Sequence, residues 1–595
     1  MVKIRVCDFI AQFIEENNVK DVFLLSGGGI IHLLDGLACN QKINVVCCHH
    51  EQAASMAMDA YARVTGKVSV GFFTTGPGAT NAITGCAGAW LDSVPCIFIS
   101  GQAKRKEATY NIKIPALRQV GVQEINILPM VKSITKYSVM VNDPEEIQFN
   151  LEKALYMAKE GRPGPVWLDI PLDVQSATVE TETMKHFLVK ETKKVLAEDA
   201  ISTLEYLGNA KKPVILAGQG VRISGAMREL VVLTTQLNIP IVTSYLGIDV
   251  IDSKSPYYIG RVGIKGDRAG NLAVQQSDLL IVLGSSLPIA EIGYEYDKFA
   301  PLAKKIVVDI DLTSHKKSTI NIDLLIESDI RAFLSMMIRI THNNFESARF
   351  IAWKDTLLSF KEQYPVCLPE YAELKDKVNI YYFINTLSEV LNNEDIMITD
   401  AGSAFYAGSQ AVQIKEGMRY ITSGGFATMG FSLPASIGAC VAADGKRIMC
   451  INNDSSFQQN SQELQTIVHY NLPIKIFVLN NEGYLSIKFT QKRYFEGRLI
   501  SEGCTSGVTF PDTAKIAAAY GIPFYSVNNN IELHEVLNEI LEIEGPVICE
   551  IMTPPDQEII STDAFRKNED CSAVSESFDN TYPLLPKCGE HKPTY

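Results

Sequence analysis

The chain has 595 residues, of which 46% are hydrophobic and 21% charged, and its formal net charge is −14. This length suits three or four domains of ordinary size, and the composition is that of a globular protein. The negative charge counts against nucleic acid or an anionic membrane surface as the main partner.

The N-terminal segment, residues 1–17, carries apolar side chains at helical spacing with acids between them. This pattern predicts an amphipathic helix and not a signal peptide. The 13 cysteines form no CxxC pair and lie mostly in apolar runs, which is typical of buried thiols in a reducing compartment. No apolar run approaches the length of a membrane span. We therefore expect a cytoplasmic protein with no membrane partner.

Residues 1–185 are predicted to form a first α/β unit. Strand-like runs alternate with helical stretches there, at residues 21–25, 45–48, 68–74, 95–100 and 165–170. Strands and helices in this order predict a parallel, doubly wound sheet. A polar and charged stretch at 178–194 is predicted to be a linker.

Two further α/β units and a tail are predicted beyond the linker. A central unit is expected at 190–345, with strands at 213–216 and 306–309, and a mixed stretch follows at 341–377. A third unit is expected at 370–555. Residues 556–595 are rich in Pro, Asp, Ser and Lys and are predicted to be a tail that wraps over the body. Three doubly wound parallel-sheet domains with a C-terminal tail are the simplest description.

The stretch 447–487 combines two buried strands with two polar turns. A strand-like run at 447–451 stops at an acidic turn, and a helical pattern follows. A second strand-like run at 474–479 ends at an amide-rich turn. Two strands joined by a helix form a parallel crossover, so both strand ends emerge at one edge of the sheet. Asp454 and Asn481 are therefore expected side by side, where ligands bind such sheets.

These turns offer ligands for a metal bound to a phosphate group. The Asp454 carboxylate, the Asn481 amide and the Gly483 carbonyl are hard oxygen ligands that suit Mg²⁺, which usually takes its other ligands from phosphates and water. The helix start after Ser455 and Ser456 offers N–H groups to an anion. The sequence favours a metal–diphosphate site, and the structural alternative is a pair of polar turns that cap buried strands.

Glu51 is a second candidate. It stands at the start of an Ala-rich helix after a predicted strand that ends at His49. Alone, such a glutamate would more often serve only to complement the helix dipole. Its context is what makes a catalytic role worth proposing.

The motifs around these residues resemble the acetolactate synthase-like (acetohydroxyacid synthase) family of thiamine-diphosphate enzymes. The turn at 452–456 followed by Asn480-Asn481 resembles the family's Gly-Asp-Gly-Ser and Asn-Asn motif, although Asn453 and Ser455 replace the two glycines. The resemblance covers residues 1–555 in order, through His50-Glu51-Gln52-Ala53-Ala54, Thr74 with Gly76-Pro77-Gly78-Ala79-Thr80-Asn81, Gly161-Arg162-Pro163-Gly164-Pro165-Val166, Gly424-Gly425-Phe426-Ala427-Thr428-Met429-Gly430 and Leu433-Pro434-Ala435.

The resemblance implies a pyrimidine-binding N-terminal domain. Glu51 would hydrogen-bond the aminopyrimidine ring of thiamine diphosphate and favour its imino tautomer. Thr74, Pro77 and Asn81 would contact or border the pyrimidine. From the third unit, the backbone of Ala427 and Met429 would hold its polar edge, and the Met429 side chain would force the bent shape of the cofactor.

The resemblance also implies that the third unit binds the diphosphate. Gly402, Ser403, Ser455 and Ser456 would contact the diphosphate. The Mg²⁺ ligands would be Asp454, Asn481 and the Gly483 carbonyl. In this family the pyrimidine domain of one chain meets the diphosphate domain of another, so a homodimer is the expected minimum and a homotetramer an open alternative.

The implied reaction decarboxylates a 2-keto acid, most simply pyruvate, and joins the remaining two-carbon unit to a carbonyl acceptor. Gln123 matches a glutamine near the reacting carbons, where a neutral amide can stabilise a developing alkoxide. Gly28 would add a backbone donor. If the acceptor is a second pyruvate, the product is acetolactate.

Three positions depart from acetolactate synthases proper. Val122 replaces an aromatic residue, Thr490 replaces a tryptophan, and the segment 284–288 lacks an arginine that belongs to substrate recognition and to the FAD site. FAD stays an open alternative that this departure counts against, and Arg261 or Arg268 could replace some of the charge. The acceptor also stays open, with a keto-sugar nucleotide as one alternative. An alternative of another class is a non-catalytic thiamine-fold subunit.

Overall fold

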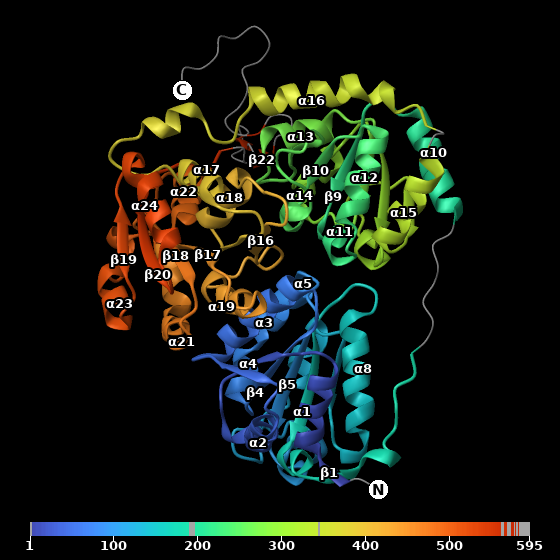
Figure 1. The fold of residues 1–595 in the computed structure, drawn as a ribbon, viewed down its shortest axis with the longest axis vertical. Helices are drawn as coiled ribbons and strands as arrows, with labels where there is room; N and C mark the ends of the chain where they lie inside the picture. Colours follow the sequence, from blue (N-terminus) through green and yellow to red (C-terminus); the bar gives the residue numbers. More distant parts are fainter. Residues whose placement is uncertain are drawn as a thin grey trace.

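The computed structural model describes residues 3–112, 114–189, 197–342 and 345–560, together with 565–567, 573–575, 578 and 581. It contains three sheets of six strands each, and all the strand pairs in them are parallel. Figure 1 shows these sheets as three bodies with helices on their faces. The prediction of three doubly wound α/β domains is confirmed, while their boundaries stay predictions.

The N-terminal sheet has the strand order β3-β2-β4-β5-β7-β6. Its central strands are buried on both faces, as the apolar runs of parallel strands require. The strands are β2 (Asp21–Leu24), β3 (Asn44–Cys47), β4 (Ser69–Phe73), β5 (Cys96–Gln102), β6 (Tyr137–Met140) and β7 (Val166–Pro171). The main helices are α1 (Val6–Glu16), α2 (Ile31–Cys39), α3 (Glu51–Thr65), α4 (Pro77–Asn81), α5 (Ile83–Leu91) and α8 (Ile147–Lys159).

The central sheet has the order β11-β10-β9-β12-β13-β14. The direction of strand order reverses between β9 and β12, which is where doubly wound sheets open a crevice. The strands are β9 (Pro213–Ala217), β10 (Ile241–Thr243), β11 (Tyr258–Arg261), β12 (Leu279–Leu283), β13 (Lys304–Asp309) and β14 (Leu324–Glu327). Helices α10 (Ala197–Asn209), α11 (Gln219–Ile223), α12 (Met227–Leu237), α13 (Arg268–Gln275) and α15 (Ile330–Thr341) cover it.

The C-terminal sheet has the order β16-β15-β17-β18-β20-β19, the same topology as the N-terminal sheet. Its strands are β15 (Ile396–Thr399), β16 (Arg419–Thr422), β17 (Ile448–Asn453), β18 (Ile474–Asn480), β19 (Phe524–Val527) and β20 (Val547–Met552). Its helices include α17 (Ile380–Val390), α18 (Ser403–Ala411), α19 (Ser432–Ala442), α20 (Asp454–Phe457), α21 (Leu464–His469), α22 (Leu485–Tyr494), α23 (Thr513–Tyr520) and α24 (Asn530–Glu542).

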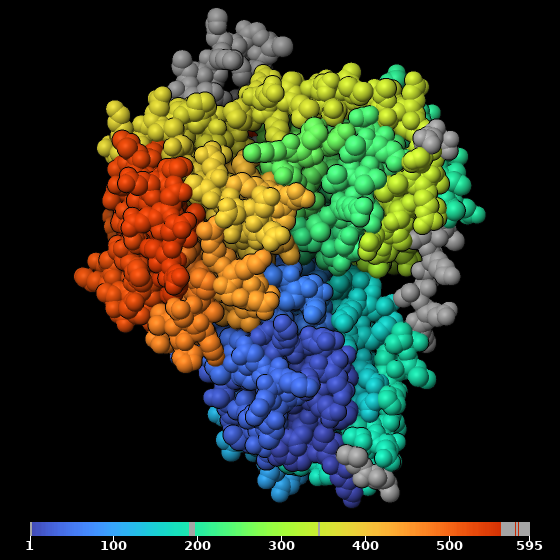
Figure 2. Space-filling view, viewed as in Figure 1, coloured from blue at the N-terminus to red at the C-terminus, as the bar shows by residue number. Residues whose placement is uncertain are grey.

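Helices α3 and α19 join the two outer units. They occupy equivalent places, since each follows the edge strand β3 or β16, and they lie next to each other in the middle of Figure 1. Small side chains allow this approach: a Cβ atom at Gly438 would overlap the Ala57 carbonyl. One apolar core therefore runs through both units. In Figure 2 the N-terminal unit, in blue, packs directly against the orange C-terminal unit and the green central one.

Two local sequence predictions, the linker and the end of a strand, need correction, and the mixed stretch proves to contain a helix. Residues Thr178–Glu180, inside the predicted linker, form β8 and pair antiparallel with β1 (Lys3–Arg5). The mixed stretch 341–377 contains a helix, α16 (Ile351–Gln363), whose Trp353 and Leu357 complete a core of the central unit. Strand β17 continues through Asn453, so the acidic turn begins two residues later than expected.

Much of the predicted tail lies outside the described residues. Its described part includes a hairpin of β21 (Phe565–Lys567) and β22 (Ala573–Ser575). Phe578 is buried with its ring 6.3 Å from that of Phe299, and Thr581 accepts a hydrogen bond from Arg268. These contacts place two tail residues on the central unit. Within the described ranges, no helix combines the length and apolarity that crossing a membrane requires.

Candidate functional site

Glu51 lies at the carboxyl edge of the N-terminal sheet. It is the first residue of α3 and is 6% exposed. Asn81, the last residue of α4, donates from Nδ2 to Glu51 Oε2 at 3.0 Å. Gly78 is held so close that a Cβ atom there would lie 3.0 Å from Glu51 Oε1. The two turns that were singled out from the sequence therefore meet around one buried carboxylate.

Thr74 and the glycines after β2 form the floor beside this carboxylate. The Thr74 hydroxyl accepts a hydrogen bond from Gly29 N at 3.0 Å. A side chain at Gly27 or Gly29 would collide with Thr74 or Thr75, whereas a Cβ at Gly28 would meet nothing within 4 Å. The glycine turn is thus required by close packing at two positions, and Gly28 faces open space.

Gln123 lies against the same turn. Its backbone has a φ of +59°, and its carbonyl approaches Gly76 so closely that a Cβ there would overlap it. Gln123, Pro77 and Asn81 are exposed, and Val122 is 87% exposed. The N-terminal half of the site is therefore a buried acid within an open, exposed rim.

Asp454 lies at the carboxyl edge of the C-terminal sheet, at the start of α20. Its carboxylate accepts hydrogen bonds from the backbone N–H groups of Ser455 at 2.7 Å, Asn481 at 3.2 Å and Gly483 at 3.3 Å. Burial raises the pKa of Asp454 to about 7. The crossover brings Asp454 and Asn481 together as the sequence predicts, and Gly483 meets the carboxylate through its N–H.

The donor set around Asp454 fits a divalent cation. Asn481 is 2% exposed, and its Oδ1 is a buried oxygen with no hydrogen-bond partner. Such an orphaned acceptor is costly unless a donor or a cation satisfies it. A buried carboxylate beside an unpaired amide oxygen is what a hard metal ion needs.

The diphosphate-binding candidates surround Asp454. Gly402 has a φ of +80° and precedes α18, whose first residue is the buried Ser403. Ser455 and Ser456 are buried in α20, and Ser456 Oγ accepts from Asn453 N at 3.1 Å. All of these polar groups face one edge of the sheet, as an anion site requires.

Ala427 and Met429 lie in the turn between β16 and α19. Ala427 has a φ of +52° and is exposed, and Phe426 is 44% exposed. The turn is fixed to the N-terminal unit of the same chain, because Asp92 accepts hydrogen bonds from the N–H groups of Gly424 and Gly425 at 3.1 and 2.7 Å.

Three family models match the chain in the order of the three units. They are the N-terminal TPP binding domain of thiamine pyrophosphate enzymes at residues 4–132, the central domain at 202–337 and the C-terminal TPP binding domain at 400–551. The acetolactate synthase large subunit of Porphyra purpurea is 32% identical over 547 residues, with 90% of each chain covered. Isozyme 1 of Escherichia coli is 31% identical, with 93% and 94% covered, and acetolactate synthase 2 of Zea mays, a chloroplastic protein, is 30% identical, with 93% and 86% covered.

The chain belongs to the acetolactate synthase-like thiamine pyrophosphate enzymes. The predicted family and enzyme class are therefore confirmed, and with them a thiamine pyrophosphate (thiamine diphosphate) cofactor.

A cavity of about 930 Å³ lies among the three units of this thiamine pyrophosphate enzyme. It opens at the carboxyl ends of β9 and β12, where the central strand order reverses. Gly220, Ser285 and Ser286 line it, together with Arg162, Arg222 and Lys317. Lys317 Nζ donates to the Ser286 carbonyl, so a positive charge lies beside the segment 284–288, which lacks the expected arginine.

Arg261 does not supply charge to the cavity. Its side chain is buried, and its Nη1 and Nη2 donate to the carbonyls of Gln410 and Val412 at 2.7 Å. These bonds join the central and C-terminal units. The sequence-based suggestion that Arg261 replaces a binding arginine is therefore not supported.

Two buried acids near the site were not found from the sequence. Glu124 accepts hydrogen bonds from Thr109 N at 2.9 Å and Val120 N at 3.3 Å, which shapes the loop that carries Gln123. Glu463 accepts from His49 N at 3.0 Å and thereby connects the C-terminal unit to the residues just before Glu51. Glu463 bonds to a residue far away in the sequence and Glu124 bonds to loop residues, so no local sequence pattern predicts either interaction.

Proposed function

We propose that this thiamine-diphosphate enzyme is a carboligase that decarboxylates pyruvate, or a similar 2-keto acid, and transfers the two-carbon unit to a carbonyl acceptor. The observation that carries the proposal is the buried pair of the Asp454 carboxylate and the unpaired Asn481 Oδ1, which suits the Mg²⁺ of a metal diphosphate. Relatives named acetolactate synthase support the choice of pyruvate as donor.

Each half of the site has a distinct task in this proposal. Asp454 and Asn481, with Gly483, hold Mg²⁺. Gly402, Ser403, Ser455 and Ser456 hold the diphosphate. When bound, the cofactor supplies the electron sink for loss of CO₂ and for carbon–carbon bond formation.

The N-terminal half handles protons and charge. Glu51 would hydrogen-bond the aminopyrimidine ring and hold the proton there, and Asn81 orients its carboxylate through the 3.0 Å bond to Oε2. Thr74 and Pro77 would border the pyrimidine, and the backbone of Ala427 and Met429 would hold its polar edge. The Gln123 amide would donate to negative charge developing on the acceptor oxygen, and Gly28 N–H would be a second donor.

A homodimer is the minimum unit in this proposal. Among the described residues, no hydrogen bond joins Glu51 or Asn81 to Asp454, Ser455 or Asn481. The bonds between the two units that lie nearest to Glu51 run beside it, from His49 N to Glu463 and from Asn460 to Gln52. The exposed rim at Val122 and the exposed Phe426 are surfaces that a second copy would cover. A tetramer would pair two such dimers.

Mixing two inactive variants tests the shared site. Glu51→Gln and Asp454→Ala homodimers should each be inactive, and subunit exchange between them should restore about a quarter of the wild-type activity, because half of the dimers are mixed and each has one intact site. Tagging one variant and isolating mixed dimers measures this directly. If isolated mixed dimers stay inactive, the two halves of a site do not come from different chains.

The acceptor and FAD are decided by two measurements. Purified protein supplied with ¹³C-labelled pyruvate, thiamine diphosphate and Mg²⁺ should release labelled CO₂, with acetolactate forming if pyruvate is also the acceptor. Absence of CO₂ release would favour a non-catalytic subunit.

Adding keto-sugar nucleotides in competition with pyruvate identifies an adduct with that alternative acceptor. The visible absorbance spectrum of the purified protein reports bound FAD.

A further inference from the structure

The side chain of Asn453 uses hydrogen-bonding groups of the candidate diphosphate site. Asn453 is 5% exposed and ends β17, in the place of the first glycine of the family motif. Its Oδ1 accepts hydrogen bonds from Ser403 Oγ at 2.5 Å and Ala404 N at 3.2 Å, and its Nδ2 donates to the Ala401 carbonyl at 2.6 Å. One amide thereby fills three hydrogen bonds in the turn between β15 and α18.

The groups that Asn453 satisfies are those an anion would use. Ala404 N belongs to the first turn of α18, where the backbone N–H groups have no partner within the helix. The preceding residue, Gly402, has no side chain to cap the helix, and a Cβ built there would meet only Asn453 Nδ2, at 3.4 Å. An oxygen acceptor on Ser403 Oγ and Ala404 N is thus supplied by Asn453 where a phosphate oxygen would otherwise supply it.

We infer that Asn453 is a built-in competitor of the diphosphate, a residue that sets cofactor affinity by leaving its hydrogen bonds when the cofactor binds. The inference rests on the proposed function, because it concerns the same diphosphate site. It predicts that this chain binds thiamine diphosphate more weakly than it would with glycine at position 453.

Three substitutions of Asn453 and its neighbour separate competition from structural support. Asn453→Gly removes the competing acceptor, so thiamine diphosphate with Mg²⁺ should bind about tenfold tighter, a change of about 1.4 kcal/mol. Asn453→Asp keeps an acceptor for Ser403 and Ala404 but adds a negative charge, so binding should be weaker than wild type. Ser455→Gly changes the other altered glycine position, whose side chain makes no such bond, and should shift the affinity less than Asn453→Gly.

A matched control measures the cost of losing an asparagine cap alone. Asn529 caps α24, away from the site, by accepting from the N–H groups of Ile531 and Glu532 at 3.0 and 3.3 Å. Asn529→Gly should lower the melting temperature of the cofactor-free protein, as Asn453→Gly should, because each change removes a cap. Only Asn453→Gly should also change cofactor affinity.

Calorimetric titration of the full-length protein gives the decisive numbers, with thiamine diphosphate and, separately, inorganic diphosphate as the ligand, each in Mg²⁺. Tighter binding of both to Asn453→Gly supports the inference. Unchanged or weaker binding, with a stability loss like that of Asn529→Gly, overturns it and leaves Asn453 a structural cap. If wild type does not bind thiamine diphosphate but Asn453→Gly does, the inference stands and the proposed function of the natural chain fails. If neither protein binds it, both fail.

Discussion

The two outer sheets share one strand order, but one pair of corresponding turns at their carboxyl edges differs in exposure, with exposed residues in the N-terminal sheet and buried ones in the C-terminal sheet. The turn after β4 in the N-terminal sheet corresponds to the turn after β17 in the C-terminal sheet. In the first, Pro77 and Asn81 are exposed around one buried acid, Glu51. In the second, Asn453, Asp454 and their neighbours are buried and already hydrogen-bonded to one another.

This difference shows that topology fixes where a site forms and side chains decide its state. The C-terminal edge is buried within one chain around Asp454, and Asn481 Oδ1 there is a buried oxygen with no hydrogen-bond partner among the described residues. The N-terminal edge holds the buried Glu51 within a rim of exposed residues, which a second chain would cover in the proposed function. The C-terminal edge, called the binding edge below, should thus control binding of the cofactor. The N-terminal edge, called the chemical edge, should control its chemistry.

Glu51→Gln should have the largest effect of these substitutions, on the proton chemistry of the N-terminal edge. Exchange of the thiazolium proton should slow by about 10²- to 10⁴-fold, the usual worth of an acid–base group, while cofactor affinity changes little. NMR of deuterium exchange into bound cofactor measures the rate. Exchange at the wild-type rate would remove Glu51 from its proposed role.

Asp454→Ala should break the binding edge. The variant should lose Mg²⁺-dependent affinity for thiamine diphosphate by at least about 10- to 100-fold, the range seen when even supporting groups of metal sites are removed. Calorimetry with and without Mg²⁺ measures it, and chelation of the metal from wild type should give the same loss. Wild-type affinity in Asp454→Ala would place the metal elsewhere.

Asp249→Asn should weaken the attachment of edge strand β16 in the C-terminal sheet while leaving the corresponding strand β3 of the N-terminal sheet unchanged. Buried Asp249 accepts from Arg222 Nε and Arg419 Nε, both at 2.8 Å, and so fixes the start of β16. On the other side, Glu463 accepts from His49 N, just beyond the corresponding strand β3. Losing the charge of a buried ion pair typically costs about 3–5 kcal/mol of unfolding free energy. Denaturant unfolding measures the loss, and an unchanged midpoint would contradict the assignment.

The same residue gives a pH dependence of known sign. Burial favours the neutral form of Asp249, but the charges of Arg222 and Arg419 outweigh it and hold its pKa below the usual value. Such a group stabilises the fold above the unfolded-state pKa of about 3.9, and the stabilisation is lost as pH falls through the folded-state pKa. The stability gap between wild type and Asp249→Asn should therefore be constant near neutrality and narrow below about pH 4.

Glu124→Gln should have the smallest effect, confined to the chemical edge. The substitution keeps the shape of the side chain but weakens its hold on Thr109 and Val120, so Gln123 is positioned less well. We expect a loss of about tenfold or less in kcat with unchanged cofactor affinity. Steady-state kinetics and calorimetry together test this, and a weakened cofactor Kd would instead assign Glu124 to the binding edge.

The sequence predicted the parts of the molecule that rest on local patterns. Apolar runs located five strands of the N-terminal sheet (β2, β3, β4, β5 and β7), β9 and β13 of the central sheet, and β17 and β18 of the C-terminal sheet. The crossover rule brought Asp454 next to Asn481. It missed β8, because a strand of three residues with one buried side chain is too short to show an alternating pattern. It also missed α16, whose few buried side chains give a weak periodicity.

The sequence identified candidate site residues but not their interactions. It noted that Asn453 replaces a glycine, yet the bonds to Ser403 and Ala404 depend on how far β17 extends beside β15. The same holds for Arg261, whose guanidinium donates to the carbonyls of residues 410 and 412 and is therefore used between units. Such long-range partners follow from the packing of whole units.

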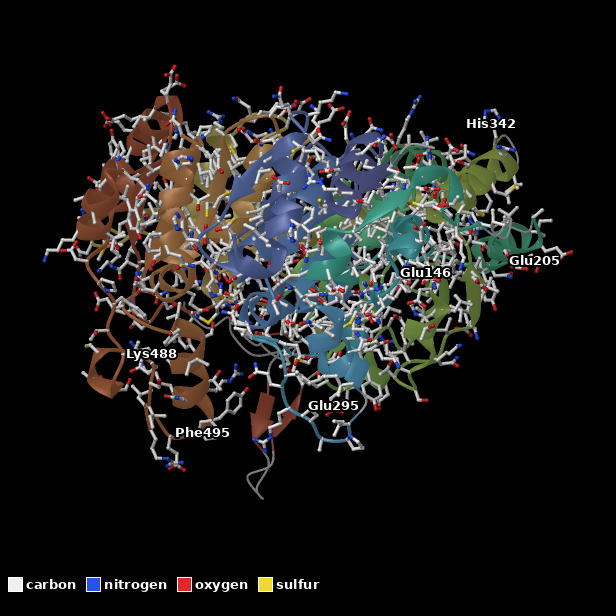
Figure 3. The ribbon with its side chains drawn as sticks, turned by 90° about the horizontal axis from the view of Figure 1, so that it is seen from below. Glu146, Glu205, Glu295, His342, Lys488 and Phe495 are labelled. Atoms are coloured by element: carbon white, nitrogen blue, oxygen red, sulfur yellow. The ribbon has the colours of Figure 1, made fainter. Side chains whose placement is uncertain are left out.

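The tight contact between Gly438 and Ala57 restricts how such a chain can diversify. A side chain at position 438 would push α19 away from α3, the helix that begins at Glu51, so we expect substitutions of Gly438 to be poorly tolerated. The surface around α22 is under no such restriction: Lys488 and Phe495 lie at the rim of the molecule in Figure 3, and Phe495 is 50% exposed. In the proposed function, we expect substitutions on α22, which carries Thr490, to alter the acceptor preference without disturbing the contact between α3 and α19.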